Sequence, residues 1–236
     1  MNRSASFRVC FFAASLGACS LLGAKDGAAE YVTPPETHSP DGRYAVKVPV
    51  FHEDQKDSDA RKDEVVDRKS GKTVAVIQAD PAYNRSLNHH GTGEATWSKD
   101  GSLLLWKVDG KWTPDALVVL KLEDKGAKWQ LDLLKTAQQA LLERTRKAAP
   151  EKYAAAKKAN AGSGSAFPDG FTVDVSADVE EGKGVKLPLS VHVDLTANPK
   201  EIEDFPANLD SYLDATVGED GSFAVKAFHL GKRDGR

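Results

Sequence analysis

Hydrophobic and polar residues alternate along much of the chain between residues 39 and 134. In residues 127–133, for example, Trp129, Leu131 and Leu133 alternate with polar side chains. Side chains of a β-strand point to opposite faces in turn, so this period of two indicates strands with one buried face. The region therefore predicts antiparallel strands that are separated by short polar turns.

Two segments of this region are similar to each other. Ser39 to Gly42 precedes an apolar strand at residues 43–48, and Ser98 to Gly101 precedes another at residues 102–106. Each strand is followed by a polar insert, an Asp, a second strand, a glycine turn and a return strand. Ser and Asp oxygens accept backbone hydrogen bonds within a turn, and Gly takes the positive φ that closes a hairpin. The pattern predicts two similar β units.

Ser39 to Val46 and Trp97 to Leu103 resemble the inner hairpins of TolB-like β-propeller blades. The resemblance covers residues 37–134 as two blade-like units. It implies a protein-binding role and carries no catalytic residue to transfer. A propeller closes its ring with about four to eight blades. Two units therefore predict an open blade-like hairpin pair and not a closed propeller.

The pattern changes between residues 135 and 162, where it predicts a pair of helices. Thr136 and Gln139 have the spacing of a capping box at the start of the first helix. Pro150 stands where the second helix would begin, because proline is favoured at the first helical position. We therefore expect a helical insertion after the blade-like region.

Alternation returns between residues 163 and 236, most clearly from Leu187 to Leu195. A final hairpin is predicted around Glu219 to Gly221, a third use of the Asp-Gly turn. The predicted fold class is therefore mainly antiparallel β with a helical insertion (α+β). It consists of the open blade-like hairpin pair and a C-terminal β section.

The first 18 residues predict export. Arg3 and Arg8 precede an uncharged apolar run that ends in small residues, as in a secretory signal peptide. Leu16 to Cys19 also resembles a bacterial lipobox, which implies that Cys19 becomes the lipidated first residue of the mature protein. The alternative is an ordinary signal peptide that is cut later, for instance after Ala24.

The predicted destination is the periplasm, or the outer membrane for a lipid-anchored form. The apolar run is too short to span a bilayer, so we expect membrane attachment through the lipid anchor alone. Residues 19–36 are small and polar and contain two prolines, which predicts a flexible tether before the folded region.

Composition excludes several chemistries. The chain has two cysteines, Cys10 and Cys19, and both belong to the signal or its end. The mature domain therefore lacks the thiols for a disulfide, for Cys-based zinc binding or for thiol catalysis. The formal net charge of −3 argues against nucleic acid as a partner, because such domains carry a basic face. No cofactor is predicted.

Two adjacent histidines, His89 and His90, form the most suggestive polar cluster. They could bind a metal together with acids from another loop, but no recognised ligand spacing accompanies them. A hydrogen-bonded or solvated loop is the simpler interpretation, and no metal site is predicted. His192 stands alone in the sequence and is expected at a surface or an edge.

The four tryptophans all lie between Trp97 and Trp129. Aromatic side chains are favoured in strands, so core and hairpin packing explains most of them. The alternative is an exposed aromatic platform for protein or glycan binding. Trp112 is the best candidate for that role, because it follows the polar segment 109–111.

The sequence therefore predicts an exported envelope protein with a non-catalytic macromolecule-binding or structural role. Its expected partner is another envelope protein or a glycan, contacted at Trp112, His89 and His90. The alternative is a periplasmic metal-dependent hydrolase or an inhibitor-type protein that uses the His89 and His90 region. No catalytic residue is assigned.

Overall fold

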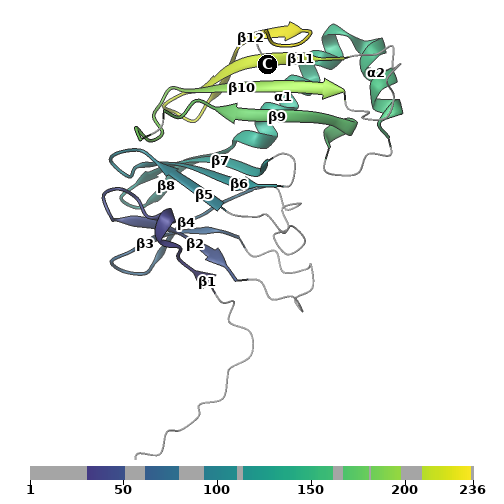
Figure 1. Cartoon of the computed structure of the whole chain (residues 1–236). Helices are drawn as coiled ribbons and strands as arrows, with labels where there is room; N and C mark the ends of the chain where they lie inside the picture. Colours follow the sequence, from purple (N-terminus) through teal and green to yellow (C-terminus); the bar gives the residue numbers. More distant parts are fainter. Residues whose placement is uncertain are drawn as a thin grey trace, which may run out of the picture.

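The structure is a computed structural model that describes residues 31–50, 62–79, 93–110, 114–161, 167–180, 182–197 and 209–234. These residues form three four-stranded antiparallel sheets, none of them closed, and two α-helices (Figure 1). The expected class, mainly antiparallel β with a helical insertion, is confirmed. The expected hairpin pair with a C-terminal section is wrong in detail, because each of the three β regions builds a sheet of its own.

The first sheet has the strand order β1-β2-β3-β4. Part of the segment expected as a tether, residues 31–36, belongs to this unit, since Tyr31 pairs with Pro49 across the sheet. A short 3-10 helix then leads into the first turn. The elements are β1 (Tyr31–Val32), η1 (Pro35–Thr37), β2 (Tyr44–Pro49), β3 (Glu64–Asp67) and β4 (Thr73–Val76).

The second sheet has the order β5-β6-β7-β8, a meander in which each strand pairs with the next. Its last strand ends at Asp132, so Leu133 begins the following helix and does not continue the strand as expected. The strands are β5 (Gly93–Trp97), β6 (Leu103–Asp109), β7 (Pro114–Glu123) and β8 (Gly126–Asp132).

The turn before β2 is held by one serine and one aspartate. The Ser39 hydroxyl donates to Asp41 Oδ1 at 2.6 Å and accepts the Tyr44 amide at 2.8 Å. The Gly42 amide donates to the Ser39 carbonyl at 2.9 Å, with Gly42 at a φ of +72°. This is the turn chemistry that the Ser-x-Asp-Gly pattern predicts.

The turn before β6 repeats the same bonds. The Ser98 hydroxyl donates to Asp100 Oδ1 at 2.6 Å and accepts the Leu103 amide at 2.9 Å. The Gly101 amide donates to the Ser98 carbonyl at 2.9 Å, again with a positive φ of +67°. The internal similarity of the sequence is therefore a similarity of structure at these two turns.

The helical insertion consists of α1 (Leu133–Ala148) and α2 (Pro150–Ala159). The capping box predicted at Thr136 is wrong, because the helix begins earlier and its N-cap is Asp132, which accepts the Lys135 amide at 3.0 Å. The fully buried Leu133 explains the difference. Burying this side chain in the first helical turn requires the chain to pass directly from β8 into α1.

The C-terminal region forms a third sheet with the order β12-β11-β10-β9. One of its faces packs around α1, which contacts all four strands. A second 3-10 helix precedes the sheet. The elements are η2 (Pro168–Gly170), β9 (Phe171–Ala177), β10 (Leu189–Ala197), β11 (Ser211–Val217) and β12 (Phe223–Leu230).

The second sheet is the middle layer of the molecule (Figure 1). Leu104 and Trp106 pack in a core shared with the first sheet. Leu103 and Leu105, on the opposite face, join a larger core with α1 and the third sheet. Burial on both faces explains why β6 is apolar at nearly every position, as strands covered on both sides are.

Two tryptophans connect the first two sheets through their indole N–H groups. Trp97 donates to the Thr37 carbonyl at 3.0 Å, and Trp106 donates to Asp63 Oδ2 at 2.9 Å. Both rings are buried, with 4 % and 1 % of their surface exposed. Core packing, expected for most of the tryptophans, is confirmed for these two.

A third tryptophan connects the second and third sheets. Trp129 on β8 donates to the Glu219 carbonyl at 3.0 Å, in the turn between β11 and β12. A Cβ atom at Gly221 in this turn would lie 2.7 Å from the Trp129 ring. Because real Cβ contacts are longer than this, glycine allows the turn to lie directly on the indole.

Candidate functional site

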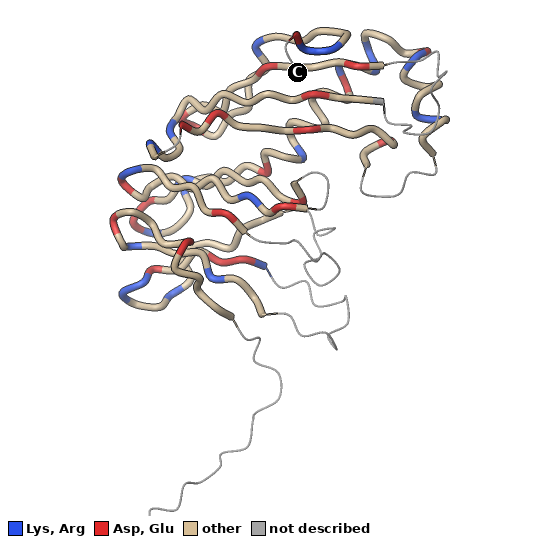
Figure 2. Tube along the Cα trace, viewed as in Figure 1, with Lys and Arg blue, Asp and Glu red and all other residues tan. Residues whose placement is uncertain are grey.

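Polar side chains cover the outer face of the third sheet, because β9, β10 and β11 alternate between buried and more exposed positions along most of their length. Figure 2 shows acidic residues on each of these three strands. In the register of the sheet, His192 lies opposite Asp214, and Asp194 lies between Asp174 and Tyr212. We call this surface the acidic face and define it by Asp174, Asp178, His192, Asp194, Tyr212, Asp214 and Arg233.

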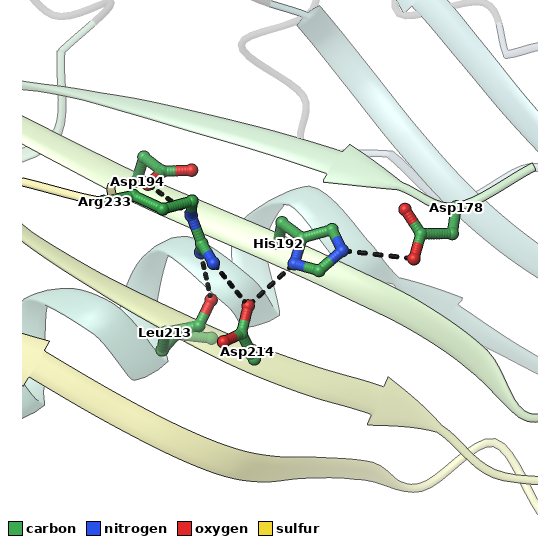
Figure 3. A network of polar contacts seen from close by, with 6 residues as sticks. All are labelled: Asp178, His192, Asp194, Leu213, Asp214 and Arg233. Carbon is green, nitrogen blue, oxygen red and sulfur yellow. Dashed lines mark hydrogen bonds and ion pairs between the residues drawn. The ribbon is translucent and has the colours of Figure 1, made fainter. Parts of the chain in front are cut away.

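His192 lies between two carboxylates of the acidic face (Figure 3). Its Nδ1 is 2.7 Å from Asp214 Oδ1, and its Nε2 is 3.1 Å from Asp178 Oδ2. A carboxylate accepts hydrogen bonds, so this arrangement favours the imidazolium form, in which both ring nitrogens donate. The hydrogen bond to Asp214 raises the pKa of His192 above that of an ordinary histidine, although partial burial opposes the change.

Arg233 is bound by two strands at once (Figure 3). Its Nε donates to Asp194 Oδ1 at 3.0 Å, and its Nη1 donates to Asp214 Oδ1 at 2.7 Å. Nη2 donates to the Leu213 carbonyl at 3.2 Å. The side chain is only 18 % exposed, so these partners replace most of the water around the guanidinium.

An aromatic stack completes the arginine site. The guanidinium carbon of Arg233 lies 4.3 Å from the centre of the Tyr212 ring, within the range of a cation–π contact. Tyr212 in turn stacks on His229 of β12, with ring centres 4.8 Å apart. The arginine therefore contacts β10 and β11 directly, and Tyr212 links it to β12 through His229.

Asp214 is the shared group of the acidic face, because its Oδ1 accepts from both His192 and Arg233. Burial alone would raise the pKa of Asp214, but these two hydrogen bonds outweigh it and lower the pKa below its usual range. The carboxylate thus stays ionised between two cations. Such an arrangement orders cations, and it engages both ring nitrogens of His192 with carboxylates.

A cavity of about 330 Å³ lies beside Arg233 on the same face. Asp174, Asp194 and Thr196 line it from the sheet, and residues 231–233 line it from the other side. It lies at the end of the strands where the chain returns over the sheet after β12. A group bound next to the guanidinium would have room there.

A second cavity, of about 420 Å³, lies between the second and third sheets. Lys107 lies in its wall and pairs with Asp109 at 2.7 Å and with Glu94 at 4.0 Å. Its floor is apolar and includes Leu105 and Val175. Glu94, Asp109 and Asp174 outnumber Lys107, so the described lining of the cavity keeps a net negative charge.

The residues that sequence reasoning chose lie outside the described residues. These are Cys19, His89, His90 and Trp112, so their predicted roles stay predictions. Gly110 and Pro114, the described residues nearest to Trp112 in the sequence, line the cavity between the second and third sheets.

His192 and Arg233 are the residues that sequence reasoning missed. The signal was present in the strand pattern, because Asp174, Asp194 and Asp214 all occupy polar positions of apolar-alternating strands. What the pattern lacked was the strand register, which makes these positions neighbours.

Within the described ranges, no three His, Cys, Asp or Glu side chains lie together in a way that could hold a metal ion. No helix in the same ranges is long and apolar enough to cross a membrane. Comparisons of the chain with protein-family models, with curated proteins and with solved structures found no match.

Proposed function

We propose that this protein is exported, is lipid-anchored at Cys19, and binds another envelope protein through the acidic face without catalysing a reaction. The observation that supports the proposal is the Asp214 carboxylate, which orders an imidazolium and a guanidinium on one exposed sheet. Surfaces with fixed charges recognise partners of complementary charge. The acidic face therefore suits a partner with a basic segment.

The chemistry of His192 supports binding over catalysis. A general base needs a free nitrogen within hydrogen-bond reach of a reacting group. Here both nitrogens of His192 are engaged by carboxylates, at 2.7 and 3.1 Å. The histidine thus fixes the positions of Asp178 and Asp214, which is a structural task within a binding surface.

We further infer that the first two sheets are propeller-like blades that serve as the base for the third sheet. Two observations support this: the matching hydrogen bonds of the Ser39 and Ser98 turns, and the shared core between the two sheets. In this interpretation the blades present the third sheet at a distance from the membrane anchor.

Photo-crosslinking in cells tests the proposal. A photoreactive amino acid is placed at Thr196, an exposed position on the outer face of the third sheet, in the tagged and natively exported protein. The matched control is Lys69, an exposed position in the turn between β3 and β4 of the first sheet. We expect one dominant envelope protein to be captured from Thr196 and not from Lys69.

The same experiment can contradict the proposal in two ways. Capture from both positions alike would mean that the acidic face is not the binding surface. Capture from Lys69 alone would move the binding surface to the blades. The mass of the native mature protein tests the anchor, because an unmodified N-terminus beyond Cys19 would exclude lipidation.

A further inference from the structure

The guanidinium site of the acidic face is filled from within the same chain. After β12, Gly231 takes a φ of +102° and turns the chain back over the sheet. This turn brings Arg233 onto Asp194 and Asp214. The site is therefore built by β10 and β11, and its occupant comes from a separate segment, residues 231–234.

The partners of Arg233 match a guanidinium group and not simply a positive charge. Asp194, Asp214 and the Leu213 carbonyl accept hydrogen bonds from three of its nitrogens, and its guanidinium carbon lies over the Tyr212 ring. A lysine ammonium is compact and could not reach these acceptors together while stacking on the ring. The site thus selects arginine by shape.

The segment that carries Arg233 has few other attachments. Gly231, Lys232 and Asp234 are exposed. Within the described residues, its hydrogen bonds to the sheet are the Gly231 amide to the Asp210 carbonyl, at 2.8 Å, and those of the Arg233 side chain. Exchange of the arginine therefore requires little more than local movement of this segment.

The neighbouring cavity supplies space for such an exchange. Residues 231–233 form one wall of the cavity of about 330 Å³, and Thr172 and Thr196 lie on its sheet side. If the segment moved away, the cavity and the guanidinium site would become continuous. A polypeptide that carried an arginine could then lie along the sheet with its side chain in the site.

We infer that the acidic face binds an arginine side chain of the partner protein in exchange for Arg233. This inference rests on the proposed function and names the chemistry that the partner presents. Arg233 keeps the site filled and the carboxylates neutralised in the free protein. An arginine on a basic segment of the partner replaces it in the complex.

The experiment uses the full chain and two matched probes, N-acetyl-arginine amide and N-acetyl-lysine amide. Each probe carries one positive charge and no free termini. Arg233→Ala empties the site, and titration calorimetry measures binding. We expect the variant to bind the arginine probe at least about tenfold more tightly than the lysine probe, because only guanidinium fits the fork of acceptors. Wild type should bind the arginine probe about tenfold more weakly than the variant, because Arg233 competes from the same chain.

A second variant shows whether the probe occupies this site. Adding Asp194→Asn to Arg233→Ala removes the carboxylate that accepts from Nε of Arg233 in the wild type. The affinity for the arginine probe should fall by about tenfold. Equal affinities for the two probes, or an unchanged affinity in the double variant, would overturn the inference. If Arg233→Ala does not fold, as judged by circular dichroism, Arg233→Lys takes its place. It keeps a cation over the sheet but loses the fork, so the arginine probe should still bind it more tightly than wild type.

Failure of this inference can be told apart from failure of the proposed function. A partner captured at Thr196 by the wild-type protein, together with no preference for the arginine probe, would leave the binding function and refute the arginine site. Selective arginine binding by Arg233→Ala without any captured partner would refute the function and keep the site.

Discussion

His192 and Arg233 both donate to one oxygen, Asp214 Oδ1, at 2.7 Å each. The charges of His192, Asp214 and Arg233 therefore depend on one another within a largely buried network. Removing the proton of His192 would take away one of the two cations that hold the Asp214 carboxylate. At the scale of single residues, this makes pH a direct probe of the acidic face.

His192→Asn should make stability less dependent on pH. The pKa of His192 is raised in the folded protein, so its contribution is fully present below about pH 6.5 and is lost as pH rises through the folded pKa. We expect the difference in unfolding free energy between wild type and His192→Asn to fall by up to about 1 kcal/mol between acidic and basic pH. Urea unfolding measures it.

The control for this prediction is Asp178→Asn, which removes the more distant carboxylate and keeps Asp214. It should reduce the pH-dependent difference without abolishing it. A difference between wild type and His192→Asn that stays constant over the whole pH range would contradict the prediction.

Trp106→Phe should destabilise the protein by about 2–3 kcal/mol, from lost packing and a lost hydrogen bond to a buried carboxylate. Trp106 is 1 % exposed, and its indole donates to Asp63, which is itself 4 % exposed. Trp129→Phe is the matched control, because its partner is the carbonyl of exposed Glu219. Urea unfolding should show a clearly smaller loss of unfolding free energy for Trp129→Phe than for Trp106→Phe. Equal losses in the two variants would contradict this prediction.

At the scale of elements, the Asp-Gly turns connect two sheets as well as two strands. A Cβ atom at Gly101, in the turn before β6, would lie 2.6 Å from Asp41 Oδ1 in the turn before β2. The two repeated turns therefore lie against each other. Two features favour glycine at position 101: its backbone φ of +67° and the close approach of the Asp41 carboxylate.

Gly71→Ala and Gly101→Ala separate these two features. Gly71 has nearly the same φ, +69°, but no atom lies within 4 Å of its Cβ position. Gly71→Ala should therefore cost about 1 kcal/mol, from the left-handed backbone alone. Gly101→Ala should cost roughly 1 kcal/mol more, because the new methyl group displaces the Asp41 carboxylate. Thermal unfolding measures both losses of stability. Equal losses would show that the contact between Gly101 and Asp41 does not contribute.

At the scale of the whole molecule, the second sheet belongs to both hydrophobic cores. Its Leu104 face packs with the first sheet, and its Leu103 face packs with α1 and the third sheet. Neither neighbouring sheet could unfold without exposing apolar surface of the middle one. We therefore expect the three sheets to unfold together.

Two probes test this cooperativity. Trp97, Trp106 and Trp129 lie on β5, β6 and β8, so fluorescence reports mainly on the second sheet, whereas circular dichroism reports on every sheet. The two transitions should coincide. Phe171 is fully buried in the third sheet. Phe171→Ala should lower the free energy of unfolding that each probe measures by about 3–5 kcal/mol. A fluorescence transition that this variant leaves unchanged would mean that the third sheet unfolds alone.

The sequence by itself determined the local structure of this protein. The alternation of residues predicted strands, and the Ser39 and Ser98 patterns predicted turns whose hydrogen bonds the structure shows. Pro150 marked the start of α2. These features depend on contacts within a few residues of the chain, which a sequence pattern records directly.

The tertiary structure alone decided how these elements combine. It placed the helix start at Leu133, which is fully buried, and made Asp132 the N-cap. It also built three sheets where a hairpin pair and one section were expected. His192, a lone surface histidine in the sequence, became part of a network with Asp178 and Asp214, 14 and 22 residues away. Strand register sets such distances, and register follows from the burial of a whole sheet face and not from any local pattern.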